Sequence, residues 1–321
     1  MYSVLLHYVR LFYAYKYVYE LFIQSIQFTS LIVVHFEFIK DQCQRKYIIT
    51  MNDPNMYNVA NSLQKKAAVQ CLNEYAKKIH WNNIGDSAID LGCGDGSVTV
   101  ILKKYMPGNY KKLVACDISE KAVNYANEHH SDDDTIFRVL DIEGELPEEM
   151  KGAFNHVFSF YALHWIQNQE KAFRNIYNLL DEGGDCLLTF LGYMPVYSVY
   201  SVLARCNKWQ SWLKDIDSFI SPYHAMQEPE KKVTQMMEDI GFKNIDVKCK
   251  EMLFVFDSVD AIKNTVKAIE PFDMPKDVYE EFMQDYYTVA QELGLLEINN
   301  NNIGEASINC NYCLLVVNAS K

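Results

Sequence analysis

A glycine-rich segment and an aspartate farther along the chain have the residue types and spacing needed to bind a nucleotide cofactor. The segment Gly92-Cys93-Gly94-Asp95-Gly96 follows the apolar run 87–91. Glycines let a ligand approach the backbone, and a turn between a strand and a helix presents unpaired backbone N–H groups to it. Asp117 ends the next apolar run, about 20 residues past the last glycine, where a carboxylate can accept hydrogen bonds from both ribose hydroxyls.

The elements that must position these residues alternate between strands and helices. Short apolar runs predict strands, and apolar residues three and four apart predict helices. The alternation predicts an α/β fold with a doubly wound, seven-stranded parallel sheet, whose ligands bind at the carboxyl ends of the strands. We expect strands at 87–91, 112–116, 137–142, 156–160, 186–191, 241–247 and 307–317, and helices at 57–79, 98–105, 170–180, 259–268 and 276–293.

Between the fifth and sixth predicted strands the strand pattern stops. The segment from about 195 to 239 contains helical stretches rich in Tyr, Trp and Phe. Each aromatic residue taken alone indicates packing against the sheet, because most large apolar side chains are buried in a core. As a group they suit an apolar ligand pocket. We therefore expect a helical cap that covers the substrate.

Composition and charge exclude several classes of protein. The chain has 30 Lys and Arg residues and 42 Asp and Glu residues, and the resulting net charge of −12 repels nucleic acid. Nine cysteines without disulfide-like spacing favour a reducing, cytoplasmic compartment. Cys310 and Cys313 form a C-x-x-C, but alternation along a strand would send them to opposite faces and prevent chelation. The eight histidines are dispersed, so we expect no metal site.

Residues 1–50 differ in composition from the rest of the chain. They are rich in Tyr, Phe, Ile and Val and contain no glycine or proline, which predicts a boundary near Met51 and a main domain over 51–321. The uncharged run 21–36 is shorter than the ~20 apolar residues that span a bilayer, so we expect no stable membrane insertion. Charged residues interrupt the first apolar stretch, which argues against a signal peptide. We favour a non-native leader over a membrane anchor.

Several stretches resemble a known family. The spacing G-x-G-x-G after Asp90 resembles motif I of class I S-adenosylmethionine-dependent methyltransferases, not the G-x-G-x-x-G of dinucleotide-binding strands. Longer stretches narrow the resemblance to the insect juvenile hormone acid O-methyltransferases, and the likeness runs from about Met51 to the end. The stretches are Ser62-Leu63-Gln64-Lys65, 89–99, 140–144, 158–165 and Ser221-Pro222-Tyr223-His224.

This resemblance implies a Rossmann-like fold and S-adenosylmethionine as the cofactor. By the resemblance, Asp141 would bind the adenine amino group, Ile142 would pack on the adenine ring, and Phe160 would line the methionine end. The cofactor-binding residues that it implies are Asp90, Gly92, Cys93, Gly94, Asp117, Ile118, Asp141, Ile142 and Phe160.

The resemblance also implies an acceptor, the carboxylate of farnesoic acid or juvenile hormone acid. A carboxylic acid with a pKa near ~4 is already ionised at cellular pH, so it needs alignment and not a general base. Neutral donors suit that task, and the family pattern assigns it to Gln64 and Trp165. Chemistry alone leaves open an exposed Gln64 and a core Trp165. His164 could orient the carboxylate or serve as a structural hydrogen-bonding group. The substrate pocket would include Tyr161, Tyr223 and His224.

Two other functions fit the same residues. One is a methyltransferase for another small carboxylic acid, although a polycarboxylate would call for several Arg or Lys side chains in a pocket that has few. The other is a non-catalytic protein that binds S-adenosylmethionine. The presence of all four residues Asp90, Asp117, Gln64 and Trp165 argues against it. Turnover would separate the two classes. The pattern specifies no oligomeric state.

Overall fold

The computed structural model describes residues 61–321 except 83, 270–271, 273, 296 and 301–305. The predicted leader at 1–50 therefore lies outside the described residues, as does the predicted start of the first helix. The chain divides into two units, 1–47 and 48–321, and the described residues belong to the second. None of its described helices combines the length and apolar character that a membrane span requires.

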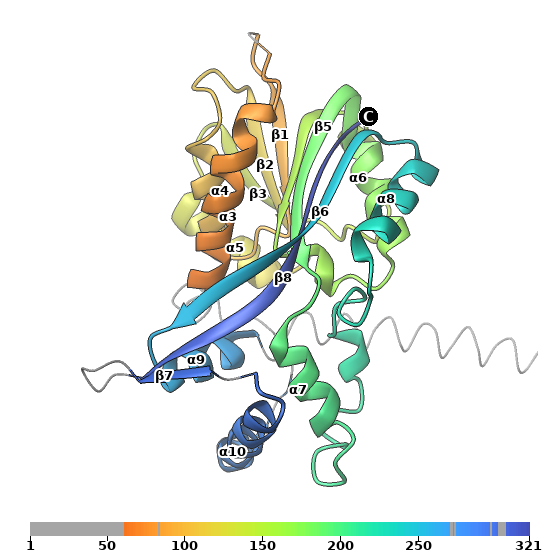
Figure 1. The fold of residues 1–321 in the computed structure, drawn as a ribbon. Helices are drawn as coiled ribbons and strands as arrows, with labels where there is room; N and C mark the ends of the chain where they lie inside the picture. The colour runs from red at the N-terminus through yellow and green to blue at the C-terminus, as the bar shows by residue number, and fades with distance from the viewer. Residues whose placement is uncertain (1–60, 83, 270–271, 273, 296, 301–305) are drawn as a thin grey trace, which may run out of the picture. The chain divides into compact units, whose positions relative to one another are not determined.

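One mixed β-sheet organises the fold, and its strand order is β3-β2-β1-β4-β5-β8-β6, with the short β7 paired to β8 (Figure 1). The first five strands run parallel. The seven-stranded Rossmann-like sheet predicted from the sequence is thus present. The strands are β1 (Ser87–Leu91), β2 (Lys112–Asp117), β3 (Thr135–Val139), β4 (Phe154–Phe160), β5 (Leu180–Leu191), β6 (Lys243–Phe256), β7 (Glu297–Asn300) and β8 (Ala306–Ser320).

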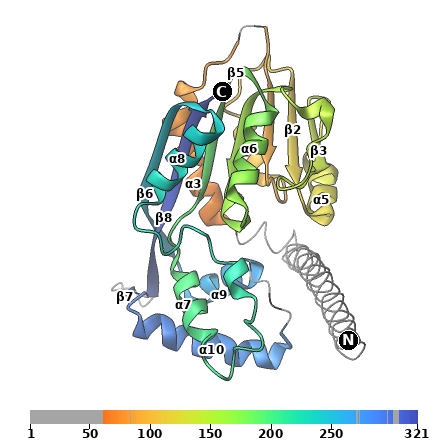
Figure 2. The same cartoon turned by 90° about the vertical axis from the view of Figure 1, so that its right-hand side faces the viewer.

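Two details of the predicted sheet were wrong. Strand β8 is antiparallel to both β5 and β6, so the sheet is not wholly parallel. The reason is that the two helices after β6 lie beyond the carboxyl ends of the strands, and the chain returns to the sheet from that side (Figure 2). Strand β6 is also twice as long as predicted, because it follows β8 as a twisted ribbon past the end of β5.

Helices cover both faces of the sheet. Helices α3, α4 and α5 lie on one face and α6 and α8 on the other (Figures 1 and 2). These helices on both faces explain why the residues of β1 and β4 are almost all buried. The helices are α3 (Ser62–Tyr75), α4 (Ser97–Lys103), α5 (Glu120–His130), α6 (Gln169–Leu179), α7 (Pro195–Leu203), α8 (Pro229–Ile240), α9 (Val259–Ile269) and α10 (Lys276–Glu292), with 3-10 turns η1 (Ala76–Lys78), η2 (Glu148–Met150), η3 (Leu163–Trp165) and η4 (Ile216–Ser218).

Helices α7, α9 and α10 form a separate layer beyond the carboxyl ends of the strands (Figure 2). The indole of Trp209 packs edge-on against Phe282 of α10 at 5.2 Å and donates a hydrogen bond of 2.8 Å to Asp285. Helix α8, which the predicted cap 195–239 includes, instead lies on the sheet beside α6, because Val233 and Met237 belong to the core under that face.

Near the amino ends of the strands, a buried histidine bonds to residues of neighbouring segments. His156, near the start of β4, pairs with Asp185 of β5 at 2.7 Å and with Asp86, just before β1, at 3.1 Å. Burial opposes a charge on His156, but the two carboxylates outweigh it and raise the pKa of the imidazole. One imidazole bound to two carboxylates therefore links β1, β4 and β5.

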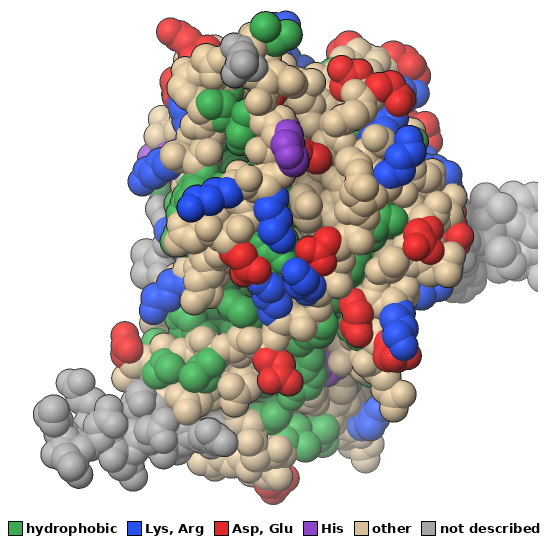
Figure 3. All heavy atoms as spheres, turned by 45° about the horizontal axis from the view of Figure 1, so that its top comes forward, with side chains coloured by type: hydrophobic (Ala, Val, Ile, Leu, Met, Phe, Trp, Pro, Cys, Tyr) green, Lys and Arg blue, Asp and Glu red, His purple; other side chains and the backbone are tan. Residues whose placement is uncertain are grey.

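The surface itself carries mixed charge. On the face shown in Figure 3, Lys and Arg side chains lie among Asp and Glu side chains without forming a continuous basic patch. Exposed pairs of this kind contribute little to stability.

Candidate active site

The glycine turn lies between β1 and α4 and is fixed to the end of β2. The backbone N–H groups of Gly92 and Cys93 donate to the carbonyl of Cys116 at 2.7 and 2.9 Å. Gly92 has a φ of 75°, and a Cβ there would lie 2.0 Å from the Cβ of Ala162. No side chain fits at this position. The turn is therefore closed by backbone contacts that only glycine permits.

Asp117 links this turn to the next helix. One carboxylate oxygen accepts from the N–H of Gly94 and the other from the N–H of Ser119, both at 2.9 Å. Ser119 is the N-cap of α5 and accepts from the N–H of Ala122. The N–H of Ile118 also donates to this carboxylate. A carboxylate has about four acceptor positions, so about one remains for a ribose hydroxyl. Ile118 is the next residue and is half-buried.

Asp90 lies one residue before the end of β1 and is buried. One carboxylate oxygen accepts from the hydroxyl of Thr99 at 2.7 Å, and the other makes no hydrogen bond with any residue in the described part of the chain. Burial raises the pKa of Asp90 to about 7; the Thr99 bond lowers it, and nearby Asp117 raises it further. Burial also raises the pKa of Asp117. Two acids without a described cation beside them fit a cofactor that carries positive charge, as S-adenosylmethionine does.

The predicted adenine and methionine residues follow β3 and end β4. The sequence predicted a strand over 137–142, but β3 ends at Val139. Asp141 and Ile142 therefore lie in the loop after the strand. Asp141 accepts from the N–H of Glu143 at 2.9 Å, and Ile142 is half-buried. Phe160 ends β4 and is buried. All nine predicted cofactor residues thus lie at the carboxyl ends of β1 to β4, which we call the cofactor edge of the sheet.

The turn η3 contains His164 and Trp165, which are predicted to bind the carboxylate of the methyl acceptor, and it lies beside that edge. His164 is buried, and its Nδ1 accepts from the N–H of Leu191 at 3.5 Å. Burial lowers the pKa of His164 to about 3, so the ring is neutral and carries its proton on Nε2. Its ring lies 4.6 Å from that of Trp165, which is half-buried. Neither His164 Nε2 nor the Trp165 indole bonds to any of the described residues, so both donors are available.

Gln64 belongs to α3, which packs on α4, the helix that follows the glycine turn. Asn61, the residue before this helix, donates to Ser97 at 2.9 Å and to Asp95 at 3.4 Å, which ties the start of α3 to the glycine turn. Gln64 lies one helical turn later on the same face. It is half-buried, and its amide has no hydrogen bond to a described residue. Sequence reasoning missed Asn61, because its partners Asp95 and Ser97 meet it only in the folded chain.

Tyr161 adopts an unusual backbone conformation between β4 and η3. Its φ is 59°, a value that is uncommon for a residue other than glycine and that tends to occur at functional sites. Its hydroxyl lies 3.1 Å from that of Tyr312 on β8, and its ring meets His164 edge-on at 6.3 Å. The sequence predicted Tyr161 but missed Tyr312, which lies 151 residues away.

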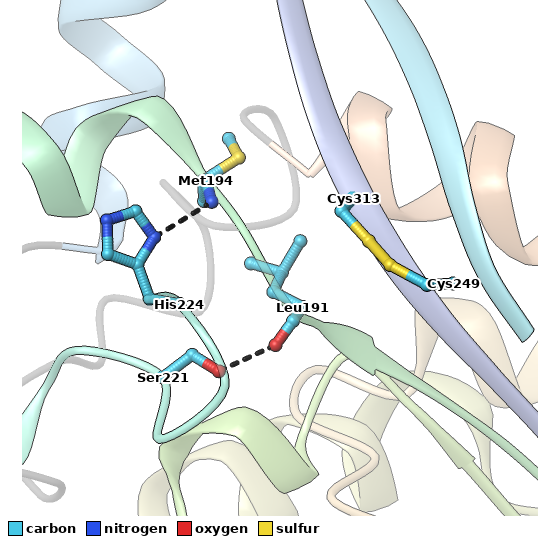
Figure 4. The surroundings of a disulfide bond; sticks show 6 residues. All are labelled: Leu191, Met194, Ser221, His224, Cys249 and Cys313. Atoms are coloured by element: carbon cyan, nitrogen blue, oxygen red, sulfur yellow. Dashed lines mark hydrogen bonds between the residues drawn. A yellow bond between two sulfur atoms is a disulfide. The ribbon is translucent and has the colours of Figure 1, made fainter. Parts of the chain in front are cut away.

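The turn 221–224 connects the site to α7 (Figure 4). Ser221 donates to the carbonyl of Leu191 at 2.7 Å. His224 accepts from the N–H of Met194 at 3.3 Å and contacts the hydroxyl of Ser198 at 3.1 Å, so both ring nitrogens have protein partners. Tyr223 donates to Gln169 at 3.0 Å. The polar atoms of Tyr223 and His224 are thus used within the protein.

A disulfide joins Cys249 of β6 to Cys313 of β8 near this turn (Figure 4). The expectation that the cysteines are reduced was wrong for this pair. The pairing follows from strand register, which makes Cys249 and Cys313 diagonal neighbours on one face, and linear spacing does not reveal it. Cys310 is buried, and alternation directs it to the other face. Among the described residues no group of acids, cysteines and histidines could hold a metal.

Comparison with known proteins identifies the class of enzyme. A family model described as a methyltransferase domain matches residues 89–188, the segment from β1 to β5 that contains the glycine turn. The YcgJ protein of Bacillus subtilis has the same fold, with a TM-score of 0.52 and 16% identity over 79% of this chain and 98% of that one. The chain therefore contains a methyltransferase domain.

Two curated relatives narrow the class to a family. The juvenile hormone acid O-methyltransferase of Bombyx mori is 56% identical over 272 residues, which cover 84% of this chain and 98% of the relative. That of Drosophila melanogaster is 41% identical over 257 residues, which cover 78% and 86%. The chain therefore belongs to the juvenile hormone acid O-methyltransferase family and is an S-adenosylmethionine-dependent O-methyltransferase.

Proposed function

We propose that this enzyme transfers the methyl group of S-adenosylmethionine to the carboxylate of a farnesoid acid, juvenile hormone acid or farnesoic acid, and so forms the methyl ester. The names of both curated relatives support this acceptor. The observation that carries the proposal is the presence of neutral donors at η3. The Trp165 indole N–H and the Nε2–H of the neutral His164 make no hydrogen bond to any described residue, and both lie beside the cofactor edge.

These donors suit an acceptor that is already an anion. The acid is ionised at cellular pH, so no residue has to remove a proton. The bound cofactor supplies a methyl group on a sulfonium. Gln64 and Trp165 would hold the carboxylate with one oxygen directed at that methyl group, and such alignment can supply roughly 7–11 kcal/mol of the barrier. A neutral donor leaves the attacking charge less stabilised in the ground state than a Lys or Arg would.

The layer of α7, α9 and α10 supplies the apolar side of the proposal. The three helices lie beyond the carboxyl ends of the strands, and their facing aromatic side chains include Tyr200 and Tyr286, 6.1 Å apart. We propose that this layer covers the hydrocarbon chain of the acid, the role assigned from sequence to a cap at 195–239.

The test is methyl transfer by the full chain from labelled S-adenosylmethionine, with farnesoic acid, juvenile hormone acid and a straight-chain fatty acid offered side by side. We expect the two farnesoid acids to give the higher kcat/KM. A preference for the fatty acid would change the acceptor class. Cofactor binding without transfer to any acid would make the chain a binding protein.

We further propose that residues 51–321 suffice for this activity and that 1–50 are dispensable. The Bombyx mori relative supports this division, since 98% of its length matches 84% of the chain. The same assay on a chain beginning at Met51 is expected to return the kcat/KM of the full chain. A loss of more than about tenfold with cofactor binding retained would give the leader a function.

A further inference from the structure

Helix α6 contacts both parts of the active site through two buried amides. Gln169 is the first residue of the helix and is only 9% exposed. Its Nε2 donates to the carbonyls of Leu163 and Ile166, both at 2.6 Å, and its Oε1 accepts from the hydroxyl of Tyr223 at 3.0 Å. Those carbonyls stand at the two ends of the turn that presents His164 and Trp165. This one amide therefore holds both ends of η3, which we call the acceptor turn.

Asn175 makes the equivalent contact at the other part of the site. It is 4% exposed, and its Nδ2 donates to the carbonyl of Ile142 at 2.6 Å and to that of Gly144 at 2.9 Å. These carbonyls belong to the loop after β3, which also contains Asp141. The second amide therefore holds the loop assigned to adenine binding, which we call the adenine loop.

The helix between the two amides is a rigid spacer. Gln169 and Asn175 are six positions apart, which is about 9 Å at 1.5 Å per residue. Asn168 caps the helix by accepting from the N–H of Lys171 at 3.1 Å. The apolar residues between and beyond the amides are fully buried in the core under this face. They are Ala172, Phe173, Ile176 and Leu179.

We propose that Gln169 and Asn175 are positioning residues that fix the acceptor turn and the adenine loop at a constant separation on α6. The proposal rests on the function proposed above, because it assigns one loop to each substrate. In-line transfer needs the acceptor oxygen behind the methyl group, and a displacement of about 1 Å can cost 10²-fold in rate. Two loops tied to one packed helix keep that distance.

The two amides have separate targets, and this makes the proposal testable. Gln169→Met keeps an unbranched side chain of similar length but removes all three hydrogen bonds. Asn175→Leu keeps the shape and removes both of its bonds. Tyr223→Phe removes only the hydroxyl that holds Oε1 of Gln169. Tyr177→Phe, on the same helix, is the matched control, because none of the hydrogen bonds found in the described residues uses its hydroxyl and its ring lies against Phe242.

For each full-length variant we would measure S-adenosylhomocysteine binding by calorimetry, the acid KM and kcat at saturating cofactor, and the melting temperature. Gln169→Met is expected to lower kcat/KM for the acid by about 10- to 100-fold with cofactor Kd within twofold of wild type. Asn175→Leu should weaken cofactor binding about tenfold and leave the acid KM within twofold. Tyr223→Phe should follow Gln169→Met with a loss of a few fold, and Tyr177→Phe should change neither parameter.

Equal changes of both parameters in Gln169→Met and Asn175→Leu, or changes in melting temperature alone, would overturn the proposal. If Gln169→Met does not fold, an unchanged acid KM and kcat in Tyr223→Phe would also overturn it. Failure of the proposed function would look different. In that case the wild-type chain would methylate none of the acids, while Asn175→Leu would still weaken S-adenosylhomocysteine binding.

Discussion

Replacement of Trp165 by phenylalanine tests the acceptor site directly. The indole N–H has no hydrogen bond to the described residues, so Trp165→Phe leaves no protein acceptor unpaired, and the ring contact with His164 can persist. We therefore expect the free energy of unfolding to fall by no more than about 1 kcal/mol. A hydrogen bond to a charged group contributes about 1.5–3 kcal/mol. At about 1.4 kcal/mol per factor of ten, kcat/KM for the acid should fall roughly 10- to 150-fold.

Steady-state kinetics with the preferred acid, together with calorimetry of S-adenosylhomocysteine binding, measures this effect. The matched control is Trp81→Phe, since the ring of Trp81 contacts that of His156 at 4.1 Å in a tilted arrangement, near the start of β4 and away from the cofactor edge. The control should keep wild-type kinetics. A kcat/KM for Trp165→Phe within threefold of wild type would refute the assignment of the indole as a carboxylate ligand. Weaker cofactor binding of the same size would make Trp165 a core residue.

Three further predictions concern the cofactor edge and the opposite edge of the sheet. Because the pKa of Asp90 is about 7, calorimetry should show S-adenosylmethionine affinity rising between pH 6 and 8 as the carboxylate ionises, and Asp90→Asn should remove this dependence. Gly92→Ala should abolish cofactor binding, because its Cβ would meet Ala162, whereas Gly152→Ala has open space and should retain it. The raised pKa of His156 contributes stability that is complete below the unfolded pKa of about 6.5 and is lost as pH rises through the folded pKa. Urea unfolding at pH 6 and pH 9 should therefore show a lower free energy of unfolding at pH 9. His156→Gln should abolish this pH dependence and lower the free energy of unfolding by about 3 kcal/mol at pH 6.

The sequence predicted the parts of the site that depend on local pattern. The strand before Gly92, the turn itself and Asp117 at the end of the next strand all lie within a short stretch, and each has a backbone or charge requirement that restricts the residue type. Parallel topology then brings the strand ends together. The positions predicted in this way stand at one edge of the sheet.

The positions that the sequence did not reveal depend on contacts made by tertiary packing. Gln169 and Asn175 are ordinary polar residues of a helix in the sequence, and their partners are backbone carbonyls, which any residue type provides. Tyr312 and Cys313 meet their partners only through the register of β8. The direction of β8 depends on where α9 and α10 lie, which hydrophobic periodicity does not encode.

The place of β8 in the sheet also has a consequence for folding during synthesis. Residues 306–320 lie between β5 and β6, so β6 has no neighbour in the sheet until that last strand has been made. An emerging chain that ends at α10 would expose the unpaired edges of both β5 and β6. Such edges favour association with other chains, and late long-range pairing slows folding. We would expect ribosome-bound intermediates to depend on chaperones at this stage.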